Sequence, residues 1–156
     1  MIIEIWTILN PIIRTFIYLS ALYSIGSVLF KVHFQKFFNE EINIYCKKII
    51  RDSALLGLII SILAFLSVAG NLGGEIQSIF ETDLIELSFE TMQGKSYLLL
   101  IVGFSLLFFS YYFQRIFMNA FNIIGTVLIL ISFIVIGHSL SQGIYTQILL
   151  LSLIHI

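Results

Sequence analysis

Four apolar segments alternate with charged segments along the chain. They lie at about 11–30, 54–72, 97–113 and 117–136. A helix needs roughly 17–25 apolar residues to cross about 30 Å of hydrocarbon, and each segment is of that length. The second segment contains no charged residue, and the first contains only Arg14. The pattern predicts an all-α fold, a polytopic transmembrane bundle with four complete spans.

Residues at the segment ends predict where these helices begin and end. Pro11 suits the first turn of the first helix, and Asp52 or Ser53 suits the N-cap of the second. Tyr111 and Tyr112 close the third segment, as an aromatic belt at a membrane surface does. We therefore expect helices that closely follow the apolar segments.

Two connecting segments also show helical periodicity. Apolar residues recur at helical spacing over 76–87 with acids between them, which predicts a short helix on the outer surface. Ser78 and Glu81 have capping-box spacing and would begin it. The alternative is a solvated acidic loop. The segment 32–50 mixes aromatic residues and lysines, which predicts a helix lying on anionic lipid.

Composition identifies the solvent. Of the 156 residues, 59% are hydrophobic and only 11% are charged, and the mean hydropathy is +1.04. A soluble domain has about 25% charged residues, so the lipid bilayer must cover most of this chain. A net charge of −1 argues against a nucleic-acid partner, which requires a concentrated basic face. We treat residues 1–156 as a single membrane domain.

The distribution of basic residues predicts the orientation. Lysines and an arginine concentrate between the first two spans, whereas acids dominate between the second and third. Basic loops stay in the cytoplasm, so segment 31–53 should be cytoplasmic. The N-terminus and the end of the fourth span should then lie outside.

A fifth apolar segment begins at about 144 and has only 13 residues up to 156. This is too short to span the bilayer, and we expect a C-terminally truncated sequence. Residues 151–156 are also what a common transposase-adapter sequence encodes, so they are interpreted as a sequencing artefact. His155 belongs to that stretch and is weak support for any site.

His138 is the main candidate for chemistry. An imidazole at the outer end of the fourth span can bind a metal or carry a proton. The alternative, favoured by the residues alone, is that His138 stabilises the negative end of the helix dipole. Tight zinc or copper sites use two to four ligands, and the thioethers of Met92 and Met118 lie near opposite membrane faces. His33 is interpreted as an ordinary interfacial residue.

The other polar residues do not indicate catalysis. The sequence contains no arrangement typical of serine hydrolases, phosphate-binding loops or zinc proteases, so no catalytic or cofactor-binding residue is assigned and an enzyme is not expected. Cys46 is interpreted as a packing residue. Small residues within the spans are expected to allow close helix contacts. They are Gly26, Gly57, Gly103, Gly125, Ser20, Ser61, Ser67 and Ser105.

Three short motifs occur in an order that resembles a known family. They are Arg14, Tyr18-Leu19, Gly26 and Phe30 in the first span, Thr91 and Gly94 in a T-x-x-G pattern within 83–96, and Gly137-His138 after the fourth span. This order is similar to that of the membrane domain of the copper resistance D family, of the CopD and YcnJ type. The resemblance extends over essentially the whole chain, but the tryptophan and paired glycines expected after a second histidine are absent.

The resemblance implies a function. A member would be a multi-pass protein of the bacterial inner membrane, acting in copper import or copper tolerance, with a copper ion as its cargo and a periplasmic CopC-like carrier as its partner. His138 would contact copper, and His155 lies near the place of the family's second histidine. Two alternatives stay open: a non-catalytic membrane subunit or scaffold that packs against partner helices, and a haem-binding protein, which would need axial ligands inside the bundle.

Overall fold

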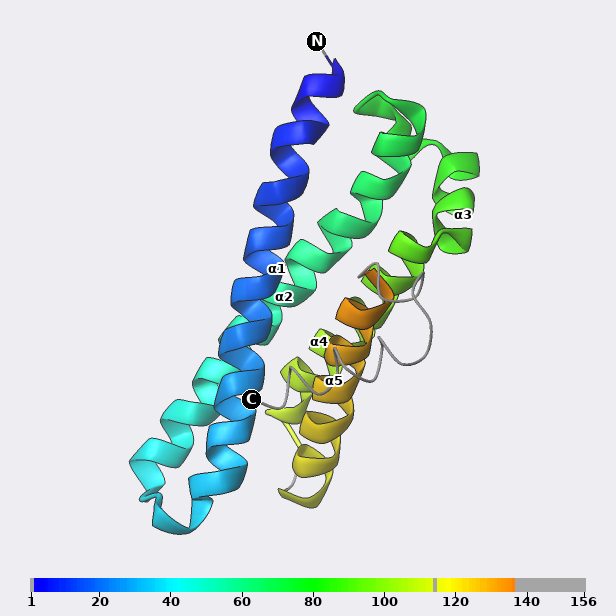
Figure 1. Ribbon diagram of the computed structural model, residues 1–156. Coiled ribbons are helices and arrows are strands. Elements are labelled where there is room, and N and C mark those ends of the chain that lie inside the picture. The colour runs from blue at the N-terminus through cyan, green and yellow to red at the C-terminus, as the bar shows by residue number, and fades with distance from the viewer. Residues whose placement is uncertain (1, 114, 137–156) are drawn as a thin grey trace, which may run out of the picture.

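The computed structural model describes residues 2–113 and 115–136, and these residues form helices joined by short turns (Figure 1). The elements are α1 (Ile2–Phe34), η1 (Gln35–Phe37), α2 (Glu40–Gly73), η2 (Gln77–Phe80), α3 (Thr82–Glu90), α4 (Met92–Ser110) and α5 (Arg115–Ile136). Helices α1, α2, α4 and α5 are long and apolar enough to cross a membrane. The prediction of an all-α bundle with four spans is confirmed.

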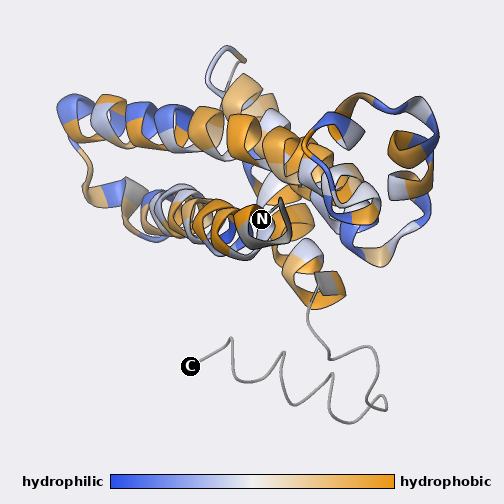
Figure 2. Cartoon of the chain, turned by 90° about the horizontal axis from the view of Figure 1, so that it is seen from above, coloured by the Kyte–Doolittle hydropathy of each residue, from blue (hydrophilic) through white to orange (hydrophobic). Residues whose placement is uncertain are grey.

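Helix α2 is the centre of the bundle. Half of its most apolar window is buried, against about a third in α1 and α5. It packs against α1 on one side and α4 on another, and α5 completes the bundle against α4 (Figure 1). The result is two antiparallel hairpins, α1–α2 and α4–α5, joined through η2 and α3. Figure 2 shows apolar residues along the helix middles and polar residues at the α1–α2 turn and around α3.

Glycine allows the closest approach between helices, at the crossing of α4 and α5. A Cβ added at Gly125 would lie 2.8 Å from the Gly103 carbonyl oxygen, and one added at Gly103 would lie 2.9 Å from the Gly125 carbonyl oxygen. The predicted packing role of these two residues is confirmed. Gly57 also packs tightly, against the Phe104 ring, whereas Gly26 has nothing within 4 Å of an added Cβ. Within the described residues Gly26 therefore makes no close helix contact, and its predicted packing role stays a prediction.

Helix α1 begins well before the predicted residue 11, and Pro11 lies inside it rather than in its first turn. The additional turns are held by contacts with α2. The Trp6 ring lies against Gly70, and the Asn10 side-chain amide donates to Asn71 Oδ1 at 3.0 Å. Because the two amides bond to each other across the helix pair, α1 can include the polar residue Asn10, which lies before the start that the hydropathy pattern predicts.

Helix α2 begins at Glu40, so the prediction of a separate surface helix over 32–50 is wrong. Asp52 and Ser53 are not its N-cap either. The N-cap is Asn39, whose Oδ1 accepts from the Ile42 backbone N–H at 2.9 Å. At about 1.5 Å per residue its 34 residues extend about 51 Å, so the helix continues beyond the hydrocarbon core.

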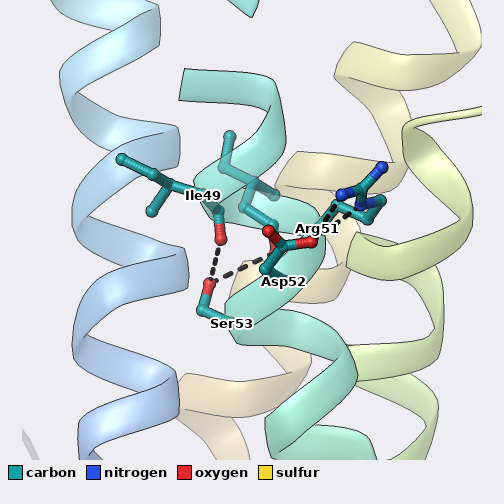
Figure 3. A network of polar contacts seen from close by, with 5 residues as sticks. Ile49, Arg51, Asp52 and Ser53 are labelled. Carbon is teal, nitrogen blue, oxygen red and sulfur yellow. Dashed lines mark hydrogen bonds and ion pairs between the residues drawn. The ribbon is translucent and has the colours of Figure 1, made fainter. Parts of the chain in front are cut away.

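Asp52 and Ser53, the predicted N-cap candidates, lie inside α2 and form contacts there (Figure 3). The Ser53 hydroxyl donates to the Ile49 carbonyl at 2.6 Å, and the Arg51 guanidinium pairs with Asp52 at 2.7 Å. The guanidinium carbon of Arg51 also lies 4.8 Å from the centre of the Tyr111 ring at the end of α4. A cation over an aromatic face is attractive, and here it connects α2 to the end of α4.

The outer segment contains the predicted helix, with a different beginning. Helix α3 starts at Thr82, after the η2 turn, and its N-cap Glu81 makes no side-chain capping bond. The Ser78 hydroxyl donates to the Glu81 carboxylate at 3.3 Å rather than accepting a backbone N–H. The predicted capping box is therefore wrong.

The T-x-x-G motif has a structural explanation at the turn from α3 to α4. Thr91 Oγ1 accepts from the Gly94 backbone N–H and donates to the Ser88 carbonyl, both at 2.9 Å. A Cβ at Gly94 would collide with the same Ser88 carbonyl. Thr91 is thus the N-cap of α4, which begins at Met92 instead of 97 and ends at Ser110. Helix α5 agrees with the predicted span 117–136 within two residues.

Candidate functional site

The histidines that the sequence favours as metal ligands, His138 and His155, lie outside the described residues, as do the fifth apolar segment from 144 and residues 151–156. Within 2–113 and 115–136, no group of three or more histidine, cysteine, aspartate or glutamate side chains is placed to hold a metal ion. His33 is exposed, with its ring centre 4.7 Å from that of Phe34.

A set of buried polar side chains lies inside the bundle instead, on the inward faces of α1, α2 and α5. Each is at most 7% exposed. We call this set the polar seam. It consists of Ser20, Ser24, Ser61, Asn122 and Thr126.

Contacts between the helices place these residues at neighbouring levels. The hydrogen bond between Asn10 and Asn71 indicates the register of the antiparallel helices α1 and α2, which brings Ser20 level with Ser61. Contact of the Tyr18 and Phe133 rings, 5.3 Å between centres, similarly fixes the register of α1 and α5.

In that second register Ser24 is level with Thr126, and Asn122 follows one turn nearer the α1–α2 turn. The seam residues therefore lie at neighbouring levels, from the middle of the bundle towards the α1–α2 turn.

Four atoms of the seam have no hydrogen-bond partner in the described part of the chain: Ser20 Oγ, Ser61 Oγ, Asn122 Oδ1 and Thr126 Oγ1. Only the Ser24 hydroxyl has a partner, the Ser20 carbonyl at 2.7 Å. A buried polar group without a partner costs about 1–3 kcal/mol, and in a bilayer an apolar residue would avoid that cost. These four groups are therefore the best candidates for contact with water or an ion.

A cavity lies at the α1–α2 turn, the end of the bundle that the sequence predicts as cytoplasmic. We call it the inner pocket. Its volume is about 330 Å³, and it is lined by Lys31, Phe38, Asn39, Glu40, Asn43, Lys47, Met118 and Asn119. Lys31 is only 7% exposed, and its ammonium donates to Met118 Sδ at 3.5 Å. Met118 thus connects α5 to the end of α1.

Sequence reasoning missed the seam residues of α5 and the pocket. Met118, Asn122 and Thr126 follow one another at intervals of four, which places them on one face of a helix. That spacing within an apolar span is the signal that was available. It did not show that the face is turned inward, or that Lys31 is buried with it.

Four apolar helices that enclose a buried polar seam define a multi-pass helical membrane protein. Residues 3–147 match the copper resistance protein D-like N-terminal domain. This match covers most of the chain, and the protein belongs to that family. The resemblance seen in the sequence is thereby confirmed. Comparisons with curated proteins and with solved structures give no significant match.

Proposed function

We propose that this protein moves copper ions across the bacterial inner membrane towards the cytoplasm. Its family indicates a role in copper resistance. Import is one of the two roles that the family resemblance implies, and segment 31–53 is predicted to face the cytoplasm. The observation that carries the proposal is the polar seam, in which three hydroxyls and the Asn122 amide oxygen have no hydrogen-bond partner among the described residues. In this proposal the protein is not an enzyme, because an ion moves and no covalent bond changes.

The chemistry of the seam suits passage better than storage. Hydroxyl and amide oxygens are hard donors and hold copper weakly, and weak binding at successive positions allows an ion to move on. The Met118 thioether is a softer donor at the inner end. The Lys31 ammonium beside Met118 Sδ disfavours a long-lived cation there, which favours release.

The outer end of the route rests on the sequence. His138 and the acidic residues near α3 would receive the ion at the outer face, and a periplasmic CopC-like carrier would deliver it. His155 would contribute only if residues 151–156 are native.

Copper accumulation in cells tests the proposal. Asn122→Leu removes a seam amide while keeping a branched side chain of the same length, and should lower copper accumulation severalfold at unchanged membrane levels. His138→Ala should do the same at the outer end. The control is Thr15→Val, which changes a polar side chain on an exposed part of α1 outside the seam and the inner pocket. Equal accumulation in the wild type, the Asn122 variant and the His138 variant would contradict the proposal.

One observation favours a second function, that of a scaffold. An apolar groove of about 320 Å³ lies between α1 and α5, and Gly26 borders it with no atom within 4 Å of an added Cβ. A partner helix would fit such a surface. Under this alternative Gly26→Leu would block the partner, and Asn122→Leu would leave copper accumulation unchanged.

A further inference from the structure

We infer that the inner pocket binds the phosphate group of an anionic phospholipid headgroup. This site shares Lys31 and Met118 with the inner end of the proposed copper route, but its binding of a headgroup does not depend on copper transport. Three features of the pocket point to it: its charge, its donors and its position among exposed apolar side chains.

The charge of the pocket is positive. Lys31 of α1 and Lys47 of α2 both line it, and Glu40 is the single acid on its wall. Lys31 is 93% buried, so its charge is held inside the protein and an anion beside it would be favourable.

The pocket also supplies amide donors. Asn39, Asn43 and Asn119 line it from α2 and α5. Asn39 uses its Oδ1 to accept the Ile42 N–H, which leaves its amino group as the donor end. A phosphate has several acceptor oxygens, and two ammonium groups with amide donors match them.

The surroundings favour a lipid over a free phosphate. Large apolar side chains at the same end of the bundle are exposed, including Phe37 (82%), Ile116 (81%) and Phe117 (59%). Such side chains belong in the bilayer interface, which places the pocket at headgroup depth. Basic pockets between membrane helices on the cytoplasmic side are typical sites for anionic headgroups.

Native mass spectrometry of the full chain in detergent tests the inference, with phosphatidylglycerol and phosphatidylcholine as probes. Phosphatidylglycerol should be retained at lower concentration than phosphatidylcholine. Lys47→Gln should weaken its retention roughly fivefold, the effect of one lysine near a membrane surface. The matched control is Lys48→Gln, the adjacent exposed lysine outside the pocket, which should behave as the wild type. Glu40→Gln should strengthen retention two- to fivefold.

Three results would overturn the inference. Equal retention of the two lipids would remove the headgroup preference, and equal weakening by Lys47→Gln and Lys48→Gln would indicate diffuse attraction instead of a site. Release of phosphatidylglycerol by millimolar inorganic phosphate would assign the pocket to a free phosphate. If Lys47→Gln does not fold, Glu40→Gln tests the inference alone. Unchanged or weaker retention of phosphatidylglycerol by Glu40→Gln would contradict an anion site in the inner pocket.

Discussion

Small polar side chains are buried both at the α4–α5 interface and in the polar seam, but the hydrogen bonding of their hydroxyls differs. At the α4–α5 interface the Ser96 hydroxyl donates to the Ser132 carbonyl of the facing helix at 2.7 Å, and the Ser132 hydroxyl donates to the Ile129 carbonyl at 2.6 Å. In the seam, Ser61 and Thr126 have equally buried hydroxyls without such partners in the described part of the chain. Residue type alone therefore does not distinguish a buried serine or threonine that serves helix packing from one whose hydroxyl is available to a ligand.

The largest expected effect is at the glycine contact of the packed interface. Gly125→Val would push a side chain against the Gly103 carbonyl oxygen and should destabilise the protein by about 3 kcal/mol. Thermal unfolding followed by circular dichroism in detergent measures it. Gly26→Val is the control, since it meets open space and should change stability by less than about 0.5 kcal/mol. Equal losses in the two variants would refute the account of the α4–α5 interface.

Removing serine hydroxyls sharpens the comparison directly. Ser96→Ala loses a hydrogen bond between helices and should lower the free energy of unfolding by about 1 kcal/mol. Ser61→Ala removes a buried hydroxyl without a hydrogen-bond partner in the described part of the chain, and should leave stability unchanged or raise it. The same unfolding measurement serves both variants, and a larger loss for Ser61→Ala would show that the seam hydroxyl has a structural partner.

The turn between α3 and α4 provides a test of similar size. Thr91→Ala removes the N-cap of α4 and the bond to Ser88, and should cost about 1 kcal/mol. Ser78→Ala, which loses a contact with an acid in the nearby η2 turn, should cost less. Hydrogen exchange of the first turn of α4 reports the difference, with faster exchange expected only for the Thr91 variant. A larger effect of Ser78→Ala than of Thr91→Ala would instead support a capping box formed by Ser78 and Glu81.

The smallest expected stability change belongs to the seam residue of α5. Thr126→Val removes a hydroxyl that has no partner among residues 2–113 and 115–136 and keeps the side-chain shape, so stability should rise by at most about 1 kcal/mol. Thr15→Val is its match on the exposed face of α1, where the hydroxyl donates to the Pro11 carbonyl at 2.8 Å. Unfolding in detergent compares the two. A marked loss of stability for Thr126→Val would mean that its hydroxyl is a structural element.

The sequence predicts the spans well because hydropathy reports contact with lipid. It predicts their ends poorly because a helix does not end where lipid contact ends. Glu40 and the basic residues after it continue α2 beyond the hydrocarbon, and Asn10 is kept in α1 by its bond to Asn71. Thr91 ends the turn before α4 through a capping bond that hydropathy does not register.

The candidate site was less predictable for a different reason. His138 attracts attention because an imidazole near a membrane is unusual, and its proposed role stays a prediction. Asn122 and Thr126 became candidates only once their inward position and lack of partners were visible, and both depend on how α5 packs against distant segments. Family membership rested on short motifs in order, which sequence comparison bears out.

Copper entry into proteoliposomes is the most direct test of the central claim, that the polar seam serves the passage of copper. Purified wild-type, Thr126→Val and Thr15→Val proteins would be reconstituted at equal density and their initial rates of copper uptake compared. The expected result is a rate reduced severalfold for Thr126→Val and a wild-type rate for Thr15→Val. Equal rates for all three proteins, at equal reconstitution, would contradict it.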